Sequence, residues 1–136
     1  MKFFSEEWRE AFEKSLKDTF TEGKTPTSIT VSLVECYSDV PQLDGKSFWH
    51  CYELEEGVLE EVSHGYSEDS IPADADFVVT APYETAVKSM TGELDNATAL
   101  VGGSMKFKGN LIRAMKLMGT YNVIQNLKRM AGSLEY

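Results

Sequence analysis

The residues best suited to catalysis or metal binding are two cysteines and two histidines. Cys36 or Cys51 could form a nucleophilic pair with His64 if the fold brought them together. His50 and Cys51 are neighbours in a run with strand character, so their side chains should point to opposite faces and cannot share a metal ion there. No CxxC or HExxH spacing occurs. Packing is the favoured role, with a catalytic pair or a disulfide as alternatives, and we expect neither enzyme activity nor a cofactor or metal.

Carboxylates and glycines offer two other kinds of chemistry. Five glutamates crowd a short stretch and could form an acid/base pair or bind calcium: Glu53, Glu55, Glu56, Glu60 and Glu61. They alternate along two expected strands and lack the spacing of a calcium loop, which favours a solvated surface. The pair Gly102-Gly103 precedes a strand, and no Lys-Ser/Thr follows it. It therefore indicates a turn and not a phosphate-binding loop.

Composition and charge exclude several classes of protein. The chain has 136 residues, 42% of them apolar and 26% charged, which predicts one globular domain spanning residues 1–136. Lys and Arg number 13 against 22 Asp and Glu, and the resulting net charge of −9 argues against a nucleic-acid partner. No apolar run reaches the roughly 18 residues of a membrane span, and residues 1–7 turn acidic after two phenylalanines. We therefore expect a cytoplasmic location.

The first half of the chain reads as one helix followed by three strands. The helix, from Ser5 to about Phe20, has Ser5 as its N-cap and apolar residues four apart on one face, namely Trp8, Phe12, Leu16 and Phe20. Polar and apolar residues then alternate over 27–33, which predicts a half-buried strand. Two further strands, 47–55 and 58–64, flank Glu56-Gly57, a pair that favours a tight hairpin.

The second half is mostly helical. A strand at 76–80 precedes a helix that begins near Pro82 and ends at Gly92. Asp95 can cap a short helix through Leu100, and a fifth strand follows at 104–108. Two closing helices are expected after it, separated by Gly119 and Thr120.

This order predicts a two-layer α+β fold with a five-stranded mixed sheet. Helices should cover one face of the sheet and water the other. The covered face should carry the apolar members of the alternating runs: Ile29, Val31, Leu33, Phe77, Val79, Met105 and Phe107. Lys106 and Lys108 should lie on the open face.

Methionine is unevenly distributed. Five of the six occur late in the chain, on faces expected to converge between the fifth strand and the closing helices: Met90, Met105, Met115, Met118 and Met130. Flexible thioethers can adapt to a variable apolar ligand, although they also serve as gap fillers in a solid core. Composition alone favours the gap-filling interpretation.

A specific pattern spans residues 92–117. It consists of Gly92-Glu93-Leu94-Asp95, Ala99, the run Gly103-Ser104-Met105-Lys106-Phe107-Lys108-Gly109-Asn110, and Ala114-Met115-Lys116-Leu117. This pattern resembles the sterol carrier protein type-two domain family, and the run 75–80 resembles the family's Ala-Asp strand. Ser104 departs from the pattern, because many members have lysine there.

The resemblance implies a noncatalytic protein with an apolar cavity between sheet and helices that binds or transfers a fatty acid, fatty acyl-CoA, sterol or similar lipid. By the resemblance the lining would comprise Phe77, Val79, Met105, Phe107, Leu111, Ala114, Met115, Met118, Ile124 and Leu127. Burial of an acyl chain contributes about 0.8 kcal/mol per CH₂, so few polar groups are needed. The alternative is a noncatalytic interaction module of the same fold that docks a partner enzyme.

Charge is segregated along the chain. Residues 47–87 hold ten acidic residues and no Lys or Arg, whereas residues 96–134 hold six basic residues and no acid. Two explanations are open. Lys106 and Lys108 could pair with neighbouring acidic strands, or a helical face with Arg113, Lys116, Lys128 and Arg129 could approach an anionic membrane transiently.

Overall fold

The computed structural model describes residues 1–136 and contains a single five-stranded sheet. In chain order the elements are α1 (Glu6–Thr19), β1 (Val31–Val40), η1 (Pro41–Leu43), β2 (Lys46–Glu55), β3 (Val58–Gly65), η2 (Glu68–Ser70), β4 (Phe77–Pro82), α2 (Tyr83–Thr91), α3 (Asn96–Val101), β5 (Lys106–Lys108) and α4 (Leu111–Met130). The strand order is β3-β2-β1-β4-β5. β1 and β4 are parallel and the other pairs antiparallel, so the predicted mixed α+β sheet is confirmed.

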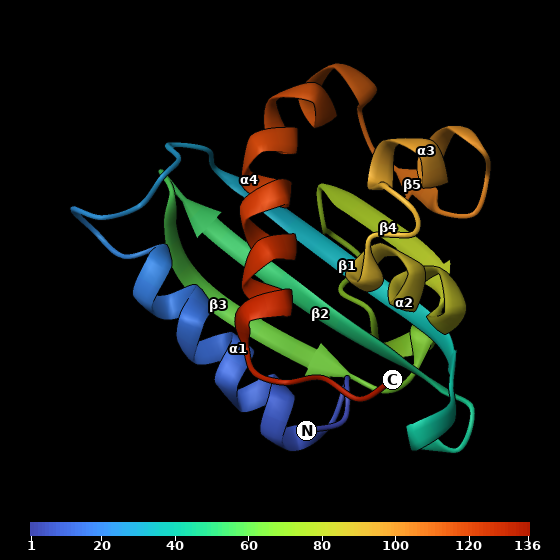
Figure 1. The fold of residues 1–136 in the computed structure, drawn as a ribbon. Coiled ribbons are helices and arrows are strands. Elements are labelled where there is room, and N and C mark those ends of the chain that lie inside the picture. The colour runs from blue at the N-terminus through green and yellow to red at the C-terminus, as the bar shows by residue number, and fades with distance from the viewer.

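The helices lie on one face of this sheet (Figure 1). The long α4 crosses the middle of the sheet, α1 lies beside β3, and α2 and α3 lie toward β4 and β5. A core of 24 buried residues fills the space between the two layers. The chain termini meet, because Lys2 and Glu135 form a β-bridge.

The first helix forms for the reasons that its sequence indicates. Ser5 caps it by accepting a hydrogen bond from the Trp8 backbone N–H at 3.2 Å. Trp8, Phe12 and Leu16 form its buried stripe. The helix thus turns its aromatic side toward the sheet.

The predicted hairpin also forms. Glu56 and Gly57 both have positive φ, 48° and 83°, as a tight two-residue turn between twisted strands requires. A Cβ at Gly57 would lie 1.9 Å from the Thr27 backbone oxygen, so only glycine fits there. The turn therefore joins β2 to β3 and lies directly against the segment between α1 and β1, to which Thr27 belongs.

The predicted facing of the strands is confirmed. Five of the expected apolar residues are buried in the helix-covered core: Val31, Leu33, Phe77, Val79 and Met105. Ile29, which precedes β1, and Phe107 pack against that core while partly buried. Lys106 and Lys108 are exposed, and neither forms an ion pair, so the cross-strand pairs considered for them are absent.

Two predicted element boundaries are wrong. The first strand spans Val31–Val40 and not 27–33; it lies between β2 and β4, and residues 33–37 are all buried, so the polar/apolar alternation is lost there. The two closing helices are one, α4. A Cβ at Gly119 would meet nothing within 4 Å, so this glycine lies in open space and costs the helix only about 1 kcal/mol.

The face of the sheet away from the helices is not wholly wet, contrary to expectation. Val34, Cys36, Trp49 and Cys51 form a small buried cluster there, with Ile71, Ala75 and Val78 packed against it. The Trp49 indole N–H is within hydrogen-bond reach of the Ser67 carbonyl at 3.1 Å and the Ser70 hydroxyl at 3.0 Å. The segment between β3 and β4 therefore covers part of this face.

Candidate functional site

An apolar pocket of about 150 Å³ lies between α3, β5 and the first half of α4. Its lining consists of Val79, Asn96, Ala97, Leu100, Val101, Met105, Phe107, Leu117, Met118 and Tyr121. Nine of these ten residues are hydrophobic, which suits an apolar ligand.

The Gly-x-Leu-Asp segment positions the α3 wall of this pocket. Gly92 ends α2 in the left-handed conformation, and the Asp95 carboxylate accepts a hydrogen bond from the Thr98 N–H at 2.8 Å, which starts α3. Ala99 is buried, and its carbonyl accepts from the Met105 N–H at 3.1 Å. These contacts hold α3 against the strand that follows it.

The Gly-Asn pair positions the opposite wall. At Gly109, with φ of 143°, a Cβ would lie 2.5 Å from the Phe77 ring, so glycine lets the turn pass close to β4. The Asn110 side chain caps α4 by accepting from the N–H groups of Ile112 and Arg113 at 3.0 and 3.1 Å. The start of α4 is thereby fixed beside β5.

The residues assigned by resemblance fall in three places. Val79, Met105, Phe107 and Met118 line the pocket. Phe77, Ala114, Ile124 and Leu127 belong to the surrounding core or pack against it, with the Phe77 ring 5.4 Å from that of Phe107. Leu111 and Met115 lie at the surface of α4, and Met115 is 78% exposed.

Six lining residues were not foreseen: Asn96, Ala97, Leu100, Val101, Leu117 and Tyr121. Leu117 and Tyr121 are one turn apart, and the predicted break at Gly119 separated them. The α3 residues carried no periodic signal, because that helix has only six residues.

Large apolar side chains reach solvent on α3 and α4. These are Leu100, Val101, Leu111, Ile112, Met115 and Met118, called the apolar rim below, of which Leu100, Val101 and Met118 also line the pocket. Val101 is 90% exposed. Met130 is exposed at the far end of α4, so the expected convergence of the late methionines is wrong for Met115 and Met130.

A buried polar network lies beneath the pocket. The Glu35 carboxylate and the Lys128 ammonium, each 1% exposed as residues, are 2.6 Å apart. Glu35 also accepts hydrogen bonds from Tyr37 at 2.7 Å, Tyr52 at 2.8 Å, Gln125 at 3.0 Å and Tyr121 at 3.4 Å.

Electrostatics in this network favour a charged carboxylate. Burial raises the pKa of Glu35, but Lys128 and the donated hydrogen bonds outweigh it and leave that pKa below its ordinary value. Burial and the nearby carboxylate hold the pKa of Tyr121 well above its ordinary value, so its hydroxyl keeps its proton. Lys128 was expected on a membrane-facing surface; that prediction is wrong, because Lys128 lies on the α4 face that meets the sheet.

The cysteines and histidines do not converge. His50 pairs with His64 across β2 and β3, whereas Cys36 and Cys51 belong to the cluster on the opposite face. Both cysteines are buried free thiols, and burial raises the pKa of each to about 11. No group of three or more His, Cys, Asp or Glu side chains is placed to hold a metal ion.

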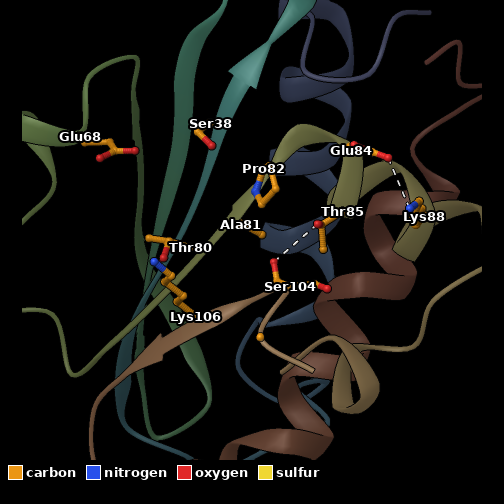
Figure 2. A pocket seen from close by; sticks show the side chains of 11 residues that line it. Ser38, Glu68, Thr80, Ala81, Pro82, Glu84, Thr85, Lys88, Ser104 and Lys106 are labelled. Atoms are coloured by element: carbon orange, nitrogen blue, oxygen red, sulfur yellow. Dashed lines mark hydrogen bonds and ion pairs between the residues drawn. The ribbon is translucent and has the colours of Figure 1, made fainter. Parts of the chain in front are cut away.

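A larger hollow of about 560 Å³ lies beside α2 and β4 (Figure 2). Only one of its eleven lining residues is hydrophobic, and it holds charges of both signs, including Glu68, Glu84 and Lys106. Lys88 pairs with Glu84 at 3.3 Å and Thr85 donates to the Ser104 carbonyl at 3.5 Å (Figure 2). An apolar ligand would therefore gain little burial there.

Solved structures of similar fold include sterol carrier proteins. A crystal structure of sterol carrier protein 2 matches with a TM-score of 0.72 and 22% identity, covering 94% of this chain and 98% of that one. A conserved hypothetical protein of Thermus thermophilus matches with 0.67 and 20%, over 98% of this chain and 92% of its own. Sterol carrier protein 2-like 2 of Aedes aegypti gives 0.55 and 18%, over 81% and 93%. At these identities the likeness shows a shared fold.

Membership is established by the sequence. Among curated proteins, no sequence matches this chain. None of the helices has the length and hydropathy that crossing a membrane would require.

The profile described as the SCP-2 sterol transfer family matches residues 55–122, half of the chain. The matched residues include α3, β5 and the first part of α4, which together enclose the pocket. The chain belongs to the SCP-2 sterol transfer family.

Proposed function

We propose that residues 1–136 act as one lipid-binding domain that holds and transfers an apolar ligand at the pocket between α3, β5 and α4. The observation that carries this proposal is the apolar pocket together with the apolar rim, three of whose six residues also line the pocket. Soluble proteins rarely leave several large apolar side chains together in water unless they bind something. Family membership supports a lipid or sterol as the ligand class.

The size of the pocket bears on how a ligand would sit. A volume of about 150 Å³ takes a group of roughly the size of benzene. A longer chain would extend along the apolar rim, or would enlarge the pocket by moving Met105 and Met118, whose thioethers adapt readily. Each CH₂ removed from water contributes about 0.8 kcal/mol.

Contact with a membrane fits transfer of such a ligand. The rim residues Ile112 and Met115 lie beside the exposed Lys116, which forms no ion pair, and residues 96–134 contain no acid. An anionic lipid surface attracts each such cation by about 1 kcal/mol. Transfer to anionic vesicles should slow in a Met115→Glu variant and not in Met130→Glu; equal slowing would exclude this contact.

The pocket itself is tested by filling it. Ala97 is exposed on α3 and lines the pocket, so Ala97→Trp should place an indole in its mouth without crowding the core. We expect binding of the neutral fluorescent probe N-phenyl-1-naphthylamine to weaken at least about tenfold, which corresponds to about 1.4 kcal/mol.

The matched control is Met130→Trp, which adds the same side chain at an exposed position near the end of α4. It should bind the probe as the native protein does. Undiminished binding by a folded Ala97→Trp protein would show that the ligand site lies elsewhere.

A further inference from the structure

Tyr121 connects the apolar pocket to the buried network. It lines the pocket, while its hydroxyl lies 3.4 Å from the Glu35 carboxylate. Of the residues that hydrogen-bond to Glu35, it is the only one that lines the pocket. A ligand in the pocket would therefore contact the ring of Tyr121, the residue that joins the pocket to the network.

Met105 covers this hydroxyl. The Met105 sulfur lies 4.0 Å from the Tyr121 oxygen, and Met105 also lines the pocket. The single Tyr121 proton goes to the charged Glu35 carboxylate, so the thioether only packs against the hydroxyl oxygen. Its flexible side chain is readily displaced from there. The sulfur thus occupies the place that a polar ligand atom could take.

The network determines which atom fits. A phenol has one proton to donate and lone pairs that accept, and the Tyr121 proton is directed to Glu35. The free capacity at Tyr121 is therefore for accepting a hydrogen bond. The partner that matches it is a donor, such as a hydroxyl group.

A ligand carboxylate is poorly matched to the same place. It only accepts hydrogen bonds, and it would approach the charged Glu35. Lys128 could neutralise it only by leaving existing partners, because its ammonium protons are used on Glu35 at 2.6 Å, Tyr37 at 3.2 Å and Gln125 at 3.3 Å.

We infer that Tyr121 selects apolar ligands whose polar end is a neutral hydroxyl: the ligand displaces the Met105 thioether and donates a hydrogen bond to the Tyr121 oxygen, while Tyr121 keeps its own bond to Glu35. This inference rests on the proposed lipid-binding function. It excludes free fatty acids as preferred ligands and favours lipid alcohols.

The preference for a hydroxyl end is tested with three competitors that have similar alkyl chains and differ in their polar end. These are 1-dodecanol, 1-methoxydodecane and dodecanoate, each displacing N-phenyl-1-naphthylamine at pH 7. The native protein should bind the alcohol about tenfold more tightly than the ether or the carboxylate, since one hydrogen bond contributes up to about that factor. In Tyr121→Phe, which keeps the ring, the alcohol and the ether should agree within about twofold, whereas dodecanoate should stay weaker because Glu35 keeps its charge.

Tyr52→Phe is the matched control. Tyr52 donates to the same carboxylate at 2.8 Å but does not line the pocket, so this variant should keep the tenfold preference even if it is less stable. Loss of the preference in both variants, or in neither, would overturn the role of Tyr121. Failure of the probe and all three competitors to bind the native protein would instead overturn the proposed function and the inference with it.

Discussion

At the α1 end of the helix-covered face, aromatic side chains fill the space between helix and strands, whereas at the α3 end apolar side chains reach solvent. Trp8 and Phe12 stack with ring centroids 5.0 Å apart, and Phe4 stacks on Phe48 at the same distance. At the other end, Val101 and Met115 are largely exposed around an apolar pocket. We call the part of this face around Trp8 and Phe12 the sealed region, and the part around the apolar pocket the open region.

This difference separates stability from binding within one core. The sealed region buries large rings almost completely, and such burial contributes strongly to the free energy of folding. The open region leaves apolar area in water that a ligand could cover. Between the two lies the Glu35–Lys128 pair, whose lysine carbonyl accepts the Trp8 indole N–H at 3.3 Å and whose glutamate accepts the Tyr121 hydroxyl.

The largest effect should come from emptying the sealed region. Trp8 is fully buried, so Trp8→Ala should lower the free energy of unfolding by about 3–5 kcal/mol, measured by urea denaturation. Met115→Ala in the open region should change it by less than about 0.5 kcal/mol. Similar losses in the two variants would contradict the distinction between the regions.

The next effect comes from the ion pair between the regions. Lys128→Met leaves the Glu35 carboxylate buried without its cation and should lower the free energy of unfolding by about 3 kcal/mol. Lys116→Met, an exposed lysine on the same helix, is the control and should be near neutral. If both variants are equally stable, Glu35 and Lys128 do not pair in the folded protein.

A smaller effect should appear as acid sensitivity of the sealed region. Burial lowers the pKa of His50 below its ordinary 6.5, even though Glu13 lies 3.3 Å from its ring. The unfolded chain therefore takes up a proton that the folded protein does not, and stability should fall as pH drops through about 6.5, by about 1.4 kcal/mol per unit of pKa depression.

Urea midpoints at pH 7.5 and 5.5 would show this loss, and His50→Gln should reduce it. Burial also lowers the pKa of His64, but that residue lies on the edge strand and is only partly buried, so His64→Gln should have less influence. A His50→Gln protein with the native pH dependence would assign the sensitivity to other groups.

Local patterns predicted the sealed region better than the open one. The four-residue spacing from Trp8 to Leu16 identifies the buried face of α1, because the repeat of a helix fixes which side chains share a face. The turn at Glu56-Gly57 was also predictable from the sequence, since few residues adopt its positive φ.

The features that the sequence did not predict depend on contacts between residues far apart in the chain. Glu35 and Lys128 lie 93 positions apart, and a lone charge in each local pattern indicates a solvated position. A helix break was expected at Gly119, but this glycine faces open space and the helix continues through it. Because of the expected break, Leu117 and Tyr121 were not predicted to lie on the same helix face. The resemblance named four of the ten residues that line the pocket, and the other six were not foreseen.

The central claim, that an apolar ligand binds in the open region, is tested most directly by NMR of the methionine methyl groups. Met105 and Met118 line the pocket, whereas Met1 and Met130 lie outside it and serve as internal controls. On titration with 1-dodecanol, the Met105 and Met118 signals should shift and saturate together while those of Met1 and Met130 stay in place. Saturable shifts confined to Met1 or Met130, or none at any methionine, would contradict the account.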